Sequence, residues 1–182
     1  MPHHLAISAT KTDATAVKNW YTGRAVLLAV MLVAAAGCTA PAKPSPMIPE
    51  RKAQLQDFAH RYTAAWCSQD PASVAAFFAP NGSLTINGGT PSVGRAAITE
   101  AARGFMTAFP DMIVAMDDLI IRDGKVIYQW TLTGTNTGPG GTGKKVRISG
   151  FEEWRMGDDG LVAESQGHFD AAEYQRQLQT GV

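Results

Sequence analysis

Apolar residues recur at steps of three and four positions along two stretches of the chain, which is the spacing of an amphipathic helix. The first stretch runs from about Glu50 to Ser68, and the second runs from Arg95 to Phe109, where Pro110 ends it. Between them, the pair Asp70-Pro71 supplies an N-cap and a first helical residue, so we predict a further helix there. The side chains that this helix would bury are Val74, Phe77 and Phe78.

From residue 111 onward the apolar period changes to two, which is typical of half-buried strands. The segments with this period are 112–121, 125–135, 144–156 and 161–169, and a short strand is expected at 83–88 after a turn at 80–83. Tight turns at 123–124 and 157–160 join neighbouring strands as hairpins. We therefore predict an α+β fold in which helices come first and an antiparallel meander follows.

The N-terminal part of the chain has the pattern of a leader rather than of a folded element. An apolar run at 25–37 follows Lys18 and Arg24 and ends in small residues, as in a secretory signal peptide. The run is shorter than the ~20 residues that a membrane helix needs. We assign 1–37 to the signal peptide, and because 1–17 precede its charges we expect translation to begin near Val17.

Cys38 directly follows the sequence Ala-Ala-Ala-Gly, and this junction resembles a bacterial lipoprotein signal. The resemblance implies that Cys38 is lipidated and anchors the chain to a membrane of the cell envelope, with the domain outside the cytoplasm. An ordinary signal peptide with a cysteine nearby is the alternative. The Pro-rich segment 38–49 would then be an extended tether, and 50–182 a single domain in which Cys67 is the remaining thiol.

Charge and motifs exclude several classes of function. Sixteen basic and sixteen acidic side chains balance, so we expect no nucleic-acid partner. The segment Gly138–Lys144 has the opening of a phosphate-binding P-loop, but Lys145 stands where Ser or Thr would hold magnesium and a strand follows instead of a helix. We interpret this glycine-rich segment as a long hairpin loop that could cover a pocket. Neither a metal-ligand cluster nor a dinucleotide motif is present, so we expect no metal and no cofactor.

Several strings in the right order are similar to the SnoaL-like polyketide cyclase branch of the NTF2-like superfamily over about 55–178. They are GRAAI at 94–98, AFPD at 108–111, DGKVIYQWTLTGTNTG at 123–138, TGKKVRISG at 142–150, and DGLVAES with FD at 159–170. The resemblance implies a cone in which a curved antiparallel sheet wraps around three N-terminal helices, with a short C-terminal helix. It also implies a mostly apolar pocket open at one end and a homodimer formed through the outer face of the sheet.

The expected pocket would be lined by aromatic side chains, and plain core packing is the alternative for each of them. The expected lining residues are Tyr62, Trp66, Phe77, Phe105, Phe109, Tyr128, Trp130 and Phe151.

A cyclase or isomerase of this type needs a carboxylate or His in a dry pocket and a donor that steadies an enolate. Strict alternation places Glu152 on the apolar face, whereas a bulge at Gly150 would place Glu153 there. The alternative for either Glu is an ion pair with Arg147 or Arg155. Candidate donors are Tyr62, Tyr128 and Asp170.

His168 and Asp170 are further catalytic candidates. Asp170 matches an Asp that the family often carries, but with Glu173 it also forms a capping box that opens the last helix. Alternation places His168 on the outer face, where it could belong to an interface. The name-giving cyclases carry a His and an acid at the places that here are Ser165 and Gly167. Asn136 and Gln129 replace a His and an Arg that are common in the family.

These observations give two hypotheses for the function. In the first, a lipid-anchored domain binds a small, largely apolar molecule and acts as a cofactor-free isomerase or cyclase through Glu152 or Glu153. In the second, the domain is a non-catalytic binding or assembly module. A cavity that is wet and polar at its base, with a desolvated Glu, favours the first, and a cavity closed by Trp66, Trp130 and Phe105 favours the second.

Overall fold

The computed structural model describes residues 48–122 and 124–182. The predicted signal peptide, Cys38 and the tether up to residue 47 lie outside the described residues. None of the helices in the described part is both long and apolar enough to cross a membrane.

Three helices precede the long strands of the meander, as the helical period predicts, and two strands lie between the second helix and the third. α1 spans Ile48–Cys67, α2 spans Pro71–Ala75 and α3 spans Gly94–Ala108. The carboxylate of Asp70 caps α2 by accepting a hydrogen bond from the backbone N–H of Ala72 at 3.1 Å. The prediction that Phe77 and Phe78 belong to this helix was wrong, because Phe78 already pairs with Val162 in the sheet.

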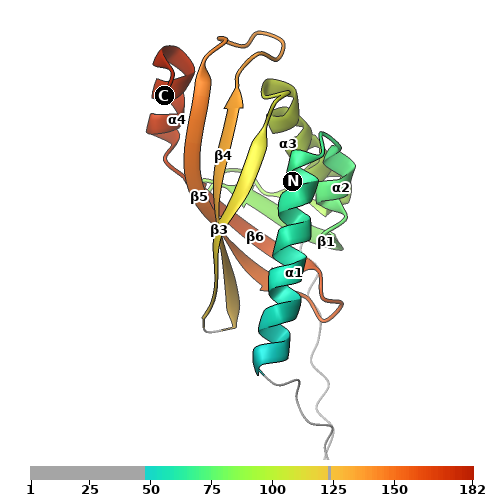
Figure 1. The fold of residues 1–182 in the computed structure, drawn as a ribbon. Helices are drawn as coiled ribbons and strands as arrows, with labels where there is room; N and C mark the ends of the chain where they lie inside the picture. Colours follow the sequence, from blue (N-terminus) through green and yellow to red (C-terminus); the bar gives the residue numbers. More distant parts are fainter. Residues whose placement is uncertain (1–47, 123) are drawn as a thin grey trace, which may run out of the picture. The chain divides into compact units, whose positions relative to one another are not determined.

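A six-stranded curved sheet accompanies these helices, in the order β2-β1-β6-β5-β4-β3 (Figure 1). The strands are β1 (Phe78–Ile86), β2 (Ser92–Val93), β3 (Ile113–Arg122), β4 (Lys125–Thr135), β5 (Lys145–Met156) and β6 (Val162–Phe169). The strands β3 to β6 form the predicted antiparallel meander, and β1 joins β6 in parallel. The turn expected at 80–83 lies inside β1, as an irregularity between Phe78 and Ser83.

The inner face of the sheet contributes to the core. In β4 the buried apolar residues Val126, Tyr128 and Leu132 follow the predicted alternation. α1 packs against β3 and α3 packs against β1, so the helices cover this face (Figure 1). The fully buried Trp154 of β5 stacks on Tyr128 with ring centroids 4.8 Å apart.

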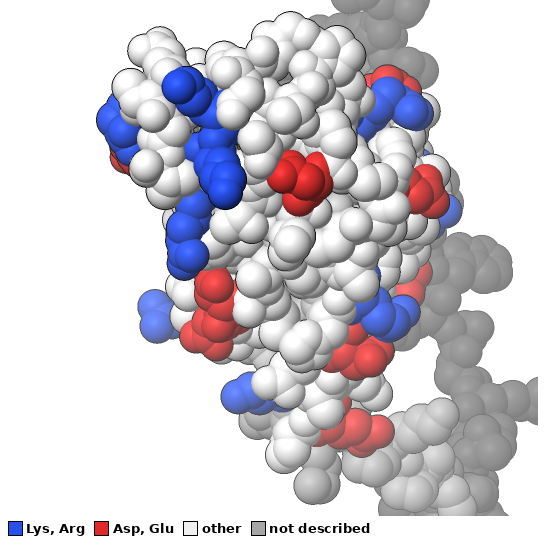
Figure 2. All heavy atoms as spheres, turned by 45° about the horizontal axis from the view of Figure 1, so that its top comes forward, with Lys and Arg blue, Asp and Glu red and all other residues white. Residues whose placement is uncertain are grey.

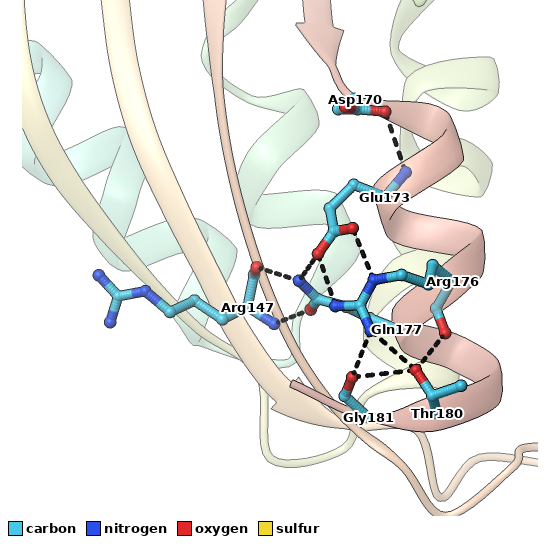
Figure 3. A network of polar contacts seen from close by, with 7 residues as sticks. All are labelled: Arg147, Asp170, Glu173, Arg176, Gln177, Thr180 and Gly181. Carbon is cyan, nitrogen blue, oxygen red and sulfur yellow. Dashed lines mark hydrogen bonds and ion pairs between the residues drawn. The ribbon is translucent and has the colours of Figure 1, made fainter.

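The C-terminal helix α4 (Ala171–Thr180) covers the part of β5 that β6 leaves unpaired. β6 ends opposite Gly150, and beyond it the side-chain amide of Gln177 takes the place of a strand (Figure 3). Its oxygen accepts from the backbone N–H of Arg147 at 2.6 Å, and its nitrogen donates to the Arg147 carbonyl at 3.0 Å. The buried Gln177 therefore satisfies an open sheet edge.

The glycine-rich loop between β4 and β5 is attached to the end of α3. Its organising residue is Asn136, whose side-chain nitrogen donates to the Ala108 carbonyl at 3.2 Å while its oxygen accepts from the Thr142 N–H at 2.8 Å. Gly138 also donates to the Ala108 carbonyl, at 3.3 Å, and a Cβ on Gly138 would collide with the Thr107 carbonyl. The loop thus closes onto α3, and its expected role as a pocket cover stays a prediction.

Charged side chains are spread over the loop end of the domain, and a group of Lys and Arg residues lies along one side of it (Figure 2). Over the whole chain the two signs balance.

Candidate functional site

A cavity of about 50 Å³ lies between the helices and the inner face of the sheet. A single water molecule needs about 10–15 Å³ measured in the same way. The lining is apolar except for one carboxylate. It comprises Trp66, Leu84, Ile86, Phe105, Val114, Tyr128, Trp130, Leu132, Glu152, Gly167 and Phe169.

The carboxylate belongs to Glu152, and the register of β5 decides its direction. β4 and β5 pair without interruption from Val126↔Trp154 to Thr135↔Lys145, so Gly150 carries no bulge. The alternation that buries Val146 therefore also turns Glu152 inward, where 6% of it is exposed. A register shift of the kind considered for Gly150 occurs instead in β3, between Met116 and Asp118.

Three buried donors hold the Glu152 carboxylate. Its Oε2 accepts from Ser165 Oγ at 2.6 Å, from Trp154 Nε1 at 2.8 Å and from Tyr62 Oη at 3.1 Å. Its Oε1 has one longer contact, 3.3 Å from the same Tyr62 hydroxyl. Oε1 is therefore the oxygen with acceptor capacity left for a ligand.

No cationic side chain in the described part of the chain pairs with this carboxylate. None of the ion pairs among the described residues includes Glu152. Burial raises the pKa of its carboxyl, and the hydrogen bonds from Ser165, Trp154 and Tyr62 offset part of that rise. The result is a carboxylate that is prepared to take up a proton, which is the property that a general base needs.

The two tyrosines considered as donors have hydroxyl groups that already have partners. Burial, and next the Glu152 charge, raise the pKa of Tyr62, whose hydroxyl donates to that carboxylate. Burial also raises the pKa of Tyr128, whose hydroxyl lies 2.7 Å from Thr63 Oγ1. Among the described residues, one buried side-chain donor has no partner, and it is Nε1 of Trp130 in the cavity wall.

The expected lining residues divide into three groups. Trp66, Phe105, Tyr128 and Trp130 line the cavity. Tyr62, Phe77 and Phe109 do not, because they pack in the core: Tyr62 beneath Glu152, Phe77 against Phe58 with centroids 5.1 Å apart, and Phe109 near Tyr174. Phe151 is 37% exposed on the outer face, since neighbours in a strand point to opposite sides and Glu152 points inward.

The other catalytic candidates lie away from the cavity. Glu153 faces outward and pairs with Lys125 at 2.7 Å, not with either expected arginine. His168 lies on the outer face with its ring 5.0 Å from Phe151. Asp170 caps α4 by accepting from the Glu173 N–H at 2.9 Å, so it is not placed as a pocket donor.

Sequence reasoning did not identify several lining residues. They are Leu84, Ile86, Val114, Leu132, Gly167 and Phe169. Alternation along the strands could have found Val114 and Leu132, which lie opposite each other on β3 and β4. Gly167 gives no such signal. Because it has no side chain, it leaves space beside Glu152: a Cβ at this position would lie 3.7 Å from Cγ of Glu152.

No metal centre accompanies the carboxylate: within 48–122 and 124–182, no three His, Cys, Asp or Glu side chains are grouped closely enough to hold a metal ion.

Comparison with known proteins identifies the family of this chain. The sequence matches the family described as SnoaL-like polyketide cyclase over residues 56–178. No curated protein matches the chain.

Three solved structures illustrate the similarity. PhzB2, a phenazine biosynthesis-related protein from Pseudomonas aeruginosa, has 16% identity and a TM-score of 0.62, covering 79% of this chain and 91% of that one. A protein from Catenulispora acidiphila DSM 44928 with a ketosteroid isomerase-like fold, in complex with trimethylamine, has 15% identity and a TM-score of 0.60, covering 66% and 91%. TerC, co-crystallised with polyporic acid, has 16% identity and a TM-score of 0.56, covering 69% and 98%. At these identities the similarity shows the fold alone.

Proposed function

The chain belongs to the SnoaL-like polyketide cyclase family, and we propose that its pocket binds a small, largely apolar molecule and moves a proton on it without a cofactor. The observation that carries the proposal is Glu152, a buried carboxylate without a cationic partner in an otherwise apolar cavity. Trp66, Trp130 and Phe105 line this cavity and leave it open. That arrangement favours an enzyme over a non-catalytic module whose cavity is filled by aromatic side chains.

The reaction is removal of a proton from a carbon next to a carbonyl group, with Oε1 of Glu152 as the base. Such a step opens the way to an isomerisation or an aldol-type cyclisation. The apolar walls supply the dry surroundings in which a carboxylate is a stronger base than in water. Solved structures of this fold include complexes with trimethylamine and with polyporic acid, which supports the use of the pocket for small molecules.

Proton exchange on a small ketone tests this function. The full chain is incubated with 1-indanone in D₂O, and the loss of the proton signals next to the carbonyl is followed by NMR. We expect exchange faster than in buffer, and a loss of about 10²-fold or more of that acceleration in Glu152→Gln. The matched control is Glu153→Gln, the same change on the next residue, which faces outward and should leave the exchange unaltered.

The alternative function has its own outcome in this experiment. If 1-indanone binds but Glu152→Gln exchanges as fast as the wild type, the domain is a non-catalytic binding module and the proton-transfer proposal is wrong. Native mass spectrometry of the protein purified from its own host would then show which molecule the cavity retains.

We further propose that the protein is a lipid-anchored homodimer of the cell envelope. The sequence at Cys38 supports the anchor, and the exposed Phe151 with His168 beside it supports contact between the outer faces of two sheets. In a mass spectrum, a lipid on Cys38 would appear as added mass on the wild-type protein, and the variant Cys38→Ala would lack this added mass. Light scattering should give twice the monomer mass, and Phe151→Glu should return it to the monomer.

A further inference from the structure

One buried side-chain hydrogen-bond donor among the described residues has no partner, and it belongs to a residue that lines the cavity. Nε1 of Trp130 is buried and has no partner among the described residues. Buried N–H groups without partners are rare in native proteins, and each one calls for an explanation such as a water molecule, an ion or a ligand. Because Trp130 is also a wall of the cavity, a ligand is the partner that its position suggests.

The hydroxyl donors near the cavity already make hydrogen bonds within the protein. The hydroxyl of Tyr62 donates to Glu152, and that of Tyr128 is shared with Thr63. Trp66 also lines the cavity, but its indole N–H is not among the buried donors without a partner. Of the buried side-chain donors in the described part of the chain, the N–H of Trp130 is thus the one whose use by a ligand would break no bond within the protein.

The register of the sheet sets the direction of the Trp130 ring. Trp130 lies opposite Gly150 on β5, and a Cβ on that glycine would come within 2.6 Å of Cζ2 and 2.9 Å of Cη2 of the indole. The missing side chain lets the ring lie across β5 toward Phe169, with ring centroids 6.2 Å apart. Cζ2 belongs to the same edge of the indole as Nε1, so this edge faces the strand that carries Glu152.

Gly150 and Glu152 occupy the same inner face of β5 two residues apart, which corresponds to about 6.6 Å along a strand. A ligand of one or two rings spans that separation. The N–H of an indole can only donate, so the ligand atom that it meets has to be an acceptor. A carbonyl oxygen meets this requirement and also acidifies the neighbouring carbon, from which Glu152 would take its proton.

We propose that Trp130 is a specificity-determining residue whose indole N–H binds the carbonyl oxygen of a small, ring-shaped ketone, while Glu152 faces the adjacent carbon. A small tilt of the indole brings the N–H onto the oxygen of a ligand that has entered the cavity. This inference rests on the proposed function and adds to it the chemical class of the ligand. A pure hydrocarbon of the same shape would fill the cavity but leave the N–H unpaired.

A matched pair of probes tests the inference on the full chain. 1-Indanone and indane have nearly the same shape, and only the ketone has an acceptor. We expect 1-indanone to bind about 3- to 10-fold more tightly, the usual effect of one neutral hydrogen bond. In ¹⁵N-tryptophan-labelled protein, the indole proton of Trp130 should shift downfield with the ketone and not with indane.

The variant Trp130→Phe removes the N–H and keeps a ring, so it should bind both probes with the same affinity. If this variant does not fold, the wild-type signal can be assigned through its contacts with the ring of Phe169. Equal binding of both probes by the wild type, or an unshifted Trp130 signal with the ketone bound, overturns the inference and leaves an apolar pocket in place. Binding of neither probe overturns the proposed function, and this inference with it.

Discussion

Replacing Glu152 by Leu removes the acceptor that three buried donors share. Trp154, Ser165 and Tyr62 are each 0% exposed, so water cannot easily replace the carboxylate. A buried donor left without a partner costs about 1–3 kcal/mol, and the two hydroxyl groups can rotate toward other acceptors while the indole cannot. Since the substitution also removes the cost of burying a carboxylate, we expect a net loss of about 3 kcal/mol in the free energy of unfolding.

Glu152→Gln provides the comparison for this loss. The amide oxygen can take the place of Oε2 and keep the bonds from Ser165 and Trp154, while the amide nitrogen faces the Tyr62 hydroxyl. We therefore expect a change of about 1 kcal/mol or less. Glu153→Gln, which breaks an ion pair whose glutamate side chain is 34% exposed, should cost about 1 kcal/mol at most.

The pH dependence of the free energy of unfolding gives a second, independent test of Glu152. Because burial raises its pKa above the ordinary 4.5, the folded state holds the proton more tightly than the unfolded state does. Stability should therefore fall by up to about 1.4 kcal/mol per pH unit as the pH rises from the ordinary value through the raised one. Glu152→Gln should lack this fall. The carboxyls with lowered pKa, Asp111, Glu164 and Glu173, lose their contribution on the acid side in both proteins and cancel in the difference.

Urea denaturation followed by circular dichroism at several pH values measures both effects. The expected order of stability at neutral pH is wild type close to Glu152→Gln, with Glu152→Leu well below. If Glu152→Leu is as stable as Glu152→Gln, the three donors do not depend on the carboxylate. If the Gln variant keeps the fall with rising pH, another group titrates in that range and Glu152 is not the buried acid.

Other predictions concern the sheet and its edge. Gly150→Ala should lose about 3 kcal/mol because its Cβ meets an indole carbon at 2.6 Å and a backbone oxygen, whereas Gly167→Ala, with its nearest atom at 3.5 Å, should lose less than about 1 kcal/mol; urea midpoints compare the two. Gln177→Ala should cost about 2 kcal/mol and speed hydrogen exchange at the Arg147 amide, because two hydrogen bonds across the β5 edge are lost. Asp170→Ala should cost about 1 kcal/mol through loss of the α4 cap, seen as a lower melting temperature.

Periodicity was sufficient for most of the fold. It predicted the bounds of α1, α3 and the four meander strands within one or two residues, because each has one buried and one exposed face. It failed at Phe77 and Phe78, where a helical spacing continued past a helix that ends at Ala75. The parallel pairing of Phe78 with Val162 decides that boundary, and a contact so distant in sequence leaves no local pattern.

The candidate site was predictable only in part, for a related reason. Alternation alone favoured Glu152 over Glu153, and the uninterrupted β4–β5 ladder agrees with that choice. The same rule excludes Phe151 from the cavity, although its aromatic ring made it a natural lining candidate. What periodicity cannot show is which buried ring borders open space: Phe109 and Trp130 were both expected to line the pocket, but of the two only Trp130 does.

The departures from the family pattern on β6 become intelligible once the register is known. The resemblance implies a His and an acid at the positions of Ser165 and Gly167, and both are absent from these positions in this chain. In the structure Ser165 lies opposite Trp154, and Gly167 lies opposite Glu152. The hydroxyl of Ser165 donates to the Glu152 carboxylate at 2.6 Å, and the missing side chain of Gly167 leaves the space beside it free.

An acid at residue 167 would therefore compete with Glu152 for the same space and place two like charges side by side, which raises the cost of ionising either one. The two substitutions on β6 and the glutamate on β5 thus form one consistent arrangement, in which the pocket carboxylate comes from the neighbouring strand. This reasoning predicts that Gly167→Asp alone weakens the stability of the domain at neutral pH, and that Gly167→Asp combined with Glu152→Gln restores part of it. Equal losses in the single and the double variant, measured by urea denaturation, would show that the two positions do not share one site.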